Sequence, residues 1–175
     1  MSATATDDDI KAFAADPALM TAIVDSVESC LTMCDTQAKC VGVSAVPTTD
    51  LGNITGMIGV HGDVSGFITV NLAERVAMSA VGAMLQDSFE KLTPEVVDGV
   101  GEMTNIISGG IKKRLTGTSW SFSHVTVPSV IIGHNYHIAY AGGLQFLSVT
   151  FEHVNENALM LDDRLMKVAV SLIRL

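Results

Sequence analysis

Apolar and polar residues alternate with two different periods along this chain, and each period predicts a type of secondary structure. Spacings of three and four residues indicate amphipathic helices, whereas strict alternation indicates strands with one buried face. A helix is predicted to begin at Asp16-Pro17 and to continue to about Ala38, because its apolar residues are Leu19, Ile23, Val27 and Leu31. The stretch from Ala73 to Leu85 also has helical composition and spacing.

Strict alternation predicts a β-hairpin over residues 54–70, in which apolar residues and glycines share one face on either side of His61-Gly62-Asp63. Glycines inside strands weaken them unless another element packs closely, so we expect a helix to lie across this sheet. Further strands are predicted at residues 41–46, 120–127, 130–132, 137–140 and 145–153, with a break at Pro128.

A long helix between Thr93 and Thr116 separates two groups of strands. Thr93 can cap its first turn, and Pro94 at the first helical position loses only a donor that would have no partner inside the helix. Lys112-Lys113-Arg114 closes the helix, where positive charge favours the negative end of the dipole. Its apolar stripe consists of Val96, Val100, Met103 and Ile107.

The opposite side of this helix carries polar residues that do not stabilise it. Asp98, Glu102 and Asn105 fall within about 60° of one another, and Gly109 and Lys112 lie on the same face. The two carboxylates repel, asparagine competes for backbone partners, and each glycine costs about 0.5–1 kcal/mol relative to alanine. A solvated face is the simplest interpretation, but a helix with these costs either packs very closely or lets another surface approach it.

The order of elements is helix, three strands, two helices, three or four strands and a C-terminal segment. Hairpin-type connections predict an α+β fold, with helices packed on one face of a largely antiparallel sheet. A helix followed by strands occurs in residues 18–72 and again in 93–154, which is a weak internal repeat. Helical spacing of five apolar residues predicts an amphipathic helix over 157–175, with a strand from Lys167 onward as the alternative.

The composition restricts the possible partners. The chain has 175 residues, 48% of them hydrophobic and 17% charged, which suits one domain with a sizeable core. A formal net charge of -9 argues against nucleic acid or an anionic membrane as partner. No apolar run approaches the roughly 18–20 residues that cross a bilayer. The acidic N-terminus lacks the pattern of a signal peptide, so we expect a cytoplasmic protein.

Cysteine and histidine residues give little indication of a metal or redox site. Cys30, Cys34 and Cys40 are odd in number and form no Cys-x-x-Cys pair, so we expect buried or half-buried free thiols. His134 and His137 have no acidic or cysteine ligands at a fitting spacing, and no bound metal is expected.

The pattern Asp98-x-x-x-Glu102-x-x-Asn105, followed by Ile-Ile-Ser-Gly, resembles the signature helix of the CheC/CheX/FliY family of chemotaxis phosphatases. The similarity extends through the hairpin sequence GMIGVHGDVSGFITVNL, the helix over residues 73–85 and the sequence VPSVIIG, and it covers roughly residues 18–154. The resemblance implies a CheC-like fold. It also implies removal of the phosphoryl group from the aspartyl phosphate of the response regulator CheY.

The resemblance also implies roles for individual residues. Asn105 would hold a water molecule in line with the phosphorus, and Glu102 would pair with a lysine, both inserted into the regulator's active site. Asp98 would have a docking role, with Gly101, Gly109 and Lys112 as further partner-binding positions. No cofactor is expected on this chain, whereas Mg²⁺ is expected on the regulator.

One such site per chain is predicted, because Glu28 in the first helix is followed by Leu31 where a second asparagine would stand. This agrees with CheX-like members, which the resemblance implies to be homodimers. We expect a flexible N-terminus (1–16), one domain (17–156) and a C-terminal extension (157–175) packed on the domain or on a dimer partner. The alternative function is a non-catalytic adaptor that docks through the glycine-rich helix on a regulator or another cytoplasmic protein.

Overall fold

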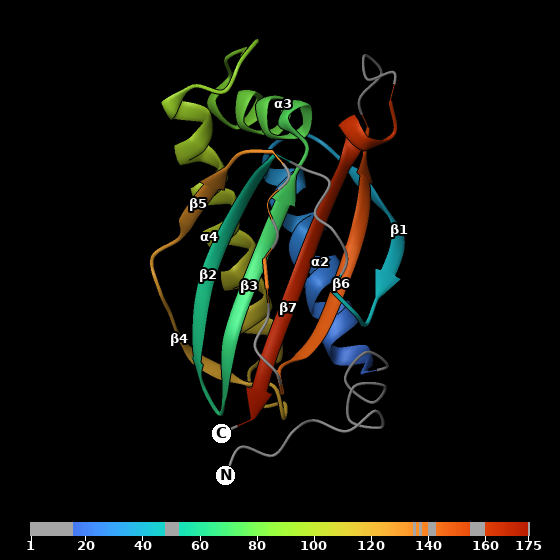
Figure 1. Ribbon diagram of the computed structural model, residues 1–175, viewed down its shortest axis with the longest axis vertical. Helices are drawn as coiled ribbons and strands as arrows, with labels where there is room; N and C mark the ends of the chain where they lie inside the picture. The colour runs from blue at the N-terminus through green and yellow to red at the C-terminus, as the bar shows by residue number, and fades with distance from the viewer. Residues whose placement is uncertain are drawn as a thin grey trace.

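A computed structural model describes residues 16–47, 53–134, 136, 138–139, 143–154 and 160–174. Within these residues, α2 (Pro17–Met33) and α4 (Pro94–Leu115) lie across one face of an antiparallel sheet, and α3 (Glu74–Leu85) lies at one end of it (Figure 1). The strands are β1 (Ala38–Ser44), β2 (Ile54–Gly62), β3 (Val64–Leu72), β4 (Phe122–Val125), β5 (Ser129–Ile132), β6 (Gln145–His153) and β7 (Leu165–Arg174). The predicted α+β class with helices on one face is confirmed.

The order of strands contains the internal repeat. The sheet runs β1-β6-β7-β3-β2, and the outer edge of β2 pairs with β4 and β5. Counted inward from the two edges of the sheet, β1 corresponds to β4 and β5, β6 corresponds to β2, and β7 corresponds to β3. The two halves, each a helix followed by these strands, are therefore arranged about the central antiparallel pair β3 and β7, where Ile68 lies opposite Val170.

The predicted C-terminal helix is wrong, because residues 165–174 form the central strand β7 after a short 3-10 helix, η1 (Asp162–Arg164). Met166, Val168, Val170 and Leu172 are fully buried and alternate along the strand. The sequence LMKVAVSLIR fits both periods, since its leucines also recur at helical spacing. The strand alternative was close, although β7 begins two residues earlier than predicted.

Other boundaries differ by a few residues. The first helix ends at Met33 rather than near Ala38, because Asp35 adopts a left-handed conformation (φ 49°) and the chain then enters β1. The predicted turn near Ile10 lies outside the described residues. Of the predicted strand 137–140, only Ile138 and Ala139 are described, and neither is in a strand.

The closest contact between α4 and the sheet occurs at Gly56 of β2. A Cβ atom placed on Gly56 would lie 1.8 Å from the Thr104 hydroxyl oxygen, and Thr104 is fully buried. That hydroxyl donates to the carbonyl of Val100 at 2.7 Å. The glycine in the strand is therefore required by the helix that lies across it, as the hairpin sequence predicts.

Tyr136, which follows β5 in the chain, contacts the second face of the sheet. The Tyr136 hydroxyl is hydrogen-bonded to the hydroxyl of Thr55, which also accepts a 2.8 Å hydrogen bond from the side chain of Asn71. Thr55 and Asn71 are buried although they lie on the face away from the helices.

Among the described residues, no helix is long and apolar enough to cross a membrane.

We predict that replacing Gly56 and replacing Gly109 have opposite effects on stability. Gly56→Ala should lower the free energy of unfolding by about 1–3 kcal/mol, because its methyl group overlaps Thr104. Gly109→Ala should raise it by about 0.5–1 kcal/mol, because a Cβ there meets no atom within 4 Å. Urea unfolding of both variants tests this, and equal effects would contradict the packing.

A buried histidine should make stability depend on pH. His153 is 1% exposed, with its Nε2 atom 2.7 Å from the Thr36 hydroxyl, and burial lowers its pKa. Below the unfolded-state pKa of about 6.5, the unfolded chain binds a proton that native His153 does not bind. The free energy of unfolding should therefore fall as pH decreases from about 6.5 towards the lowered native pKa.

Urea unfolding across this pH range should show a flatter profile for His153→Gln than for the wild type. Parallel profiles would show that another group is responsible.

Candidate functional site

Helix α4 begins and packs as its sequence predicts. The Thr93 hydroxyl accepts a hydrogen bond from the backbone N–H of Val96 at 3.4 Å, and Pro94 occupies the first turn. Hydrogen bonds from its own backbone N–H and from Thr93 lower the pKa of Glu95 in the same turn. The four residues of the apolar stripe, Val96, Val100, Met103 and Ile107, are all fully buried.

The predicted polar residues form an exposed surface, which we call the outer face of α4: Asp98, Glu102, Asn105, Gly109 and Lys112. The first four are exposed and Lys112 is half-buried. Within the described part of the chain, the side chains of Asp98, Glu102 and Asn105 have no hydrogen-bond or ion-pair partner. The packing of α4 therefore holds two carboxylates and one amide in place, although their side chains take no part in that packing.

Gly101, predicted as a further partner-binding position, is buried. A Cβ atom on Gly101 would lie 3.7 Å from Val130 Cγ2 and 3.8 Å from Pro128 Cγ. Gly101 therefore faces Pro128 and Val130 rather than solvent, so in the free protein it is not available for direct contact with a partner.

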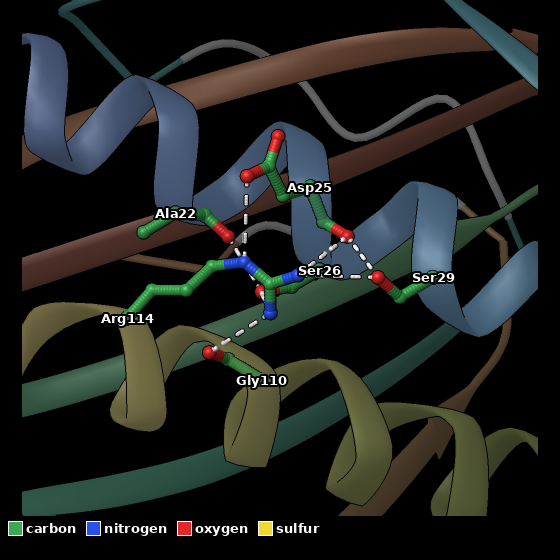
Figure 2. A network of polar contacts seen from close by, with 6 residues as sticks. All are labelled: Ala22, Asp25, Ser26, Ser29, Gly110 and Arg114. Carbon is green, nitrogen blue, oxygen red and sulfur yellow. Dashed lines mark hydrogen bonds and ion pairs between the residues drawn. The ribbon is translucent and has the colours of Figure 1, made fainter.

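A polar network between α2 and α4 fixes the orientation of the outer face (Figure 2). The Arg114 guanidinium lies 3.5 Å from the Asp25 carboxylate and donates to the Asp25 carbonyl at 3.3 Å and to the Ser29 hydroxyl at 3.2 Å. Gly110 lies close to Ser26, since a Cβ there would be 2.8 Å from the Ser26 hydroxyl oxygen. Because the helices touch at Gly110, α4 cannot rotate without breaking this contact.

The helix-dipole role predicted for Arg114 does not account for this network, because the side chain reaches across to α2. The sequence signal for this contact is the spacing of Gly110 and Arg114, which are four residues apart and therefore share the side of α4 that faces α2. Figure 2 also shows that the two helices run in opposite directions. Residue numbers increase from left to right along α2, from Ala22 to Ser29, whereas they decrease from left to right along α4, from Arg114 to Gly110.

Helix α2 does not present an equivalent pair. Leu31, where a second asparagine would be needed, is 1% exposed and belongs to the core.

Cys30 and Cys34 are buried free thiols and Cys40 is half-buried, as predicted. The pKa of Cys30 is raised chiefly by its hydrogen bond with Cys34 and by burial, and to a smaller extent by the negative charge of Glu102.

Two cavities among the described residues lie away from the outer face of α4. A cavity of about 580 Å³ is lined by polar residues such as Glu74, Arg75 and Asp163, beside α3 and η1. Another, of about 490 Å³, lies beside the β2–β3 hairpin and is largely apolar. The described residues contain no group of three or more metal-binding side chains. Neither cavity is lined by Asp98, Glu102 or Asn105.

Comparisons with known proteins agree with this fold. A CheC-like superfamily protein from Shewanella sp. PV-4 aligns with 90% of this chain and 98% of its own, at 24% identity and a TM-score of 0.75. The chemotaxis protein CheX from Vibrio vulnificus aligns with 88% of this chain and 98% of its own, at 22% identity and a TM-score of 0.75. A chain of the CheX-CheY-BeF3-Mg²⁺ complex from Borrelia burgdorferi aligns with 90% of this chain and 96% of its own, at 18% identity and a TM-score of 0.66.

These similarities define a protein with the CheC-like fold. Residues 54–152, which are 99 of the 175 residues, match the family described as chemotaxis phosphatase CheX. The chain therefore belongs to the CheX family. A search of curated protein sequences found no match to it.

We predict that Asn105→Ala does not destabilise the protein. Its side chain is exposed and has no partner among the described residues, and alanine is the better helix former by a few tenths of a kcal/mol. The free energy of unfolding in urea should equal or slightly exceed that of the wild type. A loss greater than about 1 kcal/mol would show that Asn105 has a structural role.

Proposed function

We propose that this protein dephosphorylates the aspartyl phosphate of a CheY-type response regulator by inserting the outer face of α4 into the regulator's active site. The observation that carries the proposal is the pair Glu102 and Asn105, which are exposed and have no partner among the described residues, on a helix whose orientation is fixed by packing. Membership of the chemotaxis phosphatase CheX family supports the activity. The complex of a structurally similar chain, described as CheX-CheY-BeF3-Mg²⁺, supports the partner.

Asn105 is assigned the catalytic role because a carboxamide can orient water without adding charge. Its oxygen accepts a hydrogen bond from the water and holds the water in line with the phosphorus. The water oxygen forms a new bond to phosphorus while the bond to the aspartyl oxygen breaks, and the electron pair stays on the aspartate. Mg²⁺ on the regulator would neutralise the phosphoryl oxygens, so this chain needs no metal of its own.

Glu102 is assigned to docking in register, through an ion pair with a lysine of the regulator. It is three residues from Asn105, so both side chains leave the same face of the helix. Because Glu102 has no ion-pair partner within the described chain, no internal contact has to break on binding. Asp98, one turn earlier, adds negative charge that can attract a basic partner, and this attraction should weaken with salt.

A convex site explains why the two proteins divide the chemistry. The regulator holds the phosphoryl group and the metal in its own pocket, and this chain supplies the group that the pocket lacks. Hydrolysis by a positioned water then depends mainly on how firmly Asn105 is held. The packing of α4 on Gly56 and on α2 provides that rigidity.

A homodimer acting in the cytoplasm also belongs to this proposal. The open edge strand β1 exposes Val41 (48%) and Val43 (52%), an apolar edge of the kind that another chain can cover. Two chains would present two outer faces of α4. Light scattering at several protein concentrations measures the mass, and a monomeric mass throughout would contradict the dimer.

The central experiment follows dephosphorylation of a phosphorylated CheY-type regulator in the presence of Mg²⁺. Asn105→Ala should lower kcat by about a hundredfold, because the attacking water loses its orientation. Glu102→Ala should mainly raise KM. Glu28→Ala, which removes an exposed glutamate from α2, is the matched control and should change neither.

Equal rates for the wild type and Asn105→Ala would show that the catalytic assignment is wrong. Tight binding of the regulator without hydrolysis would instead favour the non-catalytic adaptor.

A further inference from the structure

The bend between β4 and β5 is held rigidly at the edge of the sheet. Thr126 exchanges two hydrogen bonds with Gly59 of β2, one from its backbone N–H to the Gly59 carbonyl and one from the Gly59 N–H to its hydroxyl, both at 2.9 Å. On the other side of the bend, Ser129 pairs with Met57 of β2. The two residues between these anchors, Val127 and Pro128, therefore have a defined position.

Val127 is the most exposed large hydrophobic residue in the described part of the chain. Its side chain is 86% exposed, whereas the next such residue, Met33, is 67% exposed. A single exposed valine needs no special explanation by itself. What distinguishes this valine is the surface that it adjoins.

Gly101 brings this bend beside the outer face of α4. A Cβ atom on Gly101 would lie in van der Waals contact with Pro128 Cγ at 3.8 Å. Gly101 is three residues after Asp98 and four residues before Asn105, so all three occupy neighbouring positions on the helix surface. The Pro128 ring therefore approaches α4 at a position adjacent to the two polar residues, and the exposed Val127 is its neighbour in the chain.

We propose that Val127 is a second, apolar contact for the response regulator, and that Gly101 is the small residue that admits it beside the site. This inference rests on the proposed function, because it takes its partner from the outer face of α4. The residue of the regulator that meets Val127 is an apolar one at the rim of its phosphorylation pocket. Val127 touches neither the phosphoryl group nor the water, so it sets affinity and specificity rather than the rate of chemistry.

The physical need for such a contact comes from the polarity of the outer face. Ion pairs at an exposed surface contribute little net affinity, because water and salt screen them. A single helix inserted into a pocket also leaves the angle between the two proteins poorly defined. An apolar side chain held on a separate, rigid element supplies both buried area and a second point of attachment.

The regulator is favoured over a second copy of this chain as the occupant. Val127 lies on the β4–β5 side of the sheet, next to Pro128, which approaches α4 at Gly101, whereas the open edge β1 is at the opposite end of the strand order. A second copy seated on Val127 would cover the outer face of α4 and block its access to a partner.

The test measures binding and turnover separately. The binding probe is a CheY-type regulator activated with beryllofluoride and Mg²⁺, and the turnover probe is the phosphorylated regulator. Val127→Asp should weaken binding and raise KM by about tenfold, with kcat at saturation unchanged. Val127→Thr, which removes apolar surface without adding charge, should weaken binding by a smaller factor of about three.

Matched controls exclude general effects. Val46→Asp adds the same charge at a valine that is 61% exposed beyond β1, and it should bind as the wild type does. Asn105→Ala should show the opposite pattern, with a lower kcat and little change in affinity. All variants should have the unfolding free energy of the wild type, because the replaced side chains are exposed.

The outcomes separate this inference from the proposed function. If both Val127→Asp and Val127→Thr bind the regulator as tightly as the wild type does, the inference is overturned, even if Asn105→Ala loses activity. Equal weakening by Val46→Asp would also overturn it, because the effect would then be one of net charge. If the wild type binds the activated regulator but does not hydrolyse the phosphorylated one, the phosphatase function is overturned. The affinities of the Val127 variants relative to the wild type would still decide the role of Val127.

Discussion

The close packing of α4 on two neighbours is the constraint on which this structure depends. Gly56 leaves room for Thr104 on the sheet side, and Gly110 leaves room for Ser26 on the α2 side. A helix touched on two sides at glycine contacts can adopt only one rotation about its axis. That rotation buries the valine stripe and leaves Glu102 and Asn105 in solvent. The direction in which Glu102 and Asn105 point is therefore a consequence of the two glycines at these contacts.

The outer face of α4 illustrates a conflict between stability and function. Two carboxylates one turn apart, an asparagine in a helix interior and an exposed glycine each weaken the helix slightly. The buried stripe and the contacts with α2 and β2 offset these costs, so the helix remains ordered without help from its polar side. This arrangement suits the proposed insertion of the outer face of α4 into another protein's pocket.

Much of the fold and the site could be predicted from the sequence. Thr93-Pro94 marks the start of α4, the period of its valines assigns the buried side, and alternation identifies the β2–β3 hairpin. The tail was missed because LMKVAVSLIR has both periods. The repeat held the missing information, since β3 in the first half requires a counterpart in the second, and only residues 165–174 can supply it.

The remaining features depend on contacts between distant segments, which periodicity does not encode. Gly101 is predicted as a partner-binding position, yet it is buried and faces Pro128 and Val130. Arg114 was read as a helix-end charge, although its partners are on α2, 85 and more residues earlier. Val127 carries no motif, and its significance comes only from its position beside the site.

The most direct test of the central claim observes the Asn105 side chain itself. In NMR spectra of the isotope-labelled protein, the side-chain amide signals of Asn105 should shift when the regulator activated with beryllofluoride and Mg²⁺ is added. The non-activated regulator should have a much smaller effect. If the Asn105 signals stay unchanged while residues on another surface shift, insertion of α4 into the regulator's active site is contradicted.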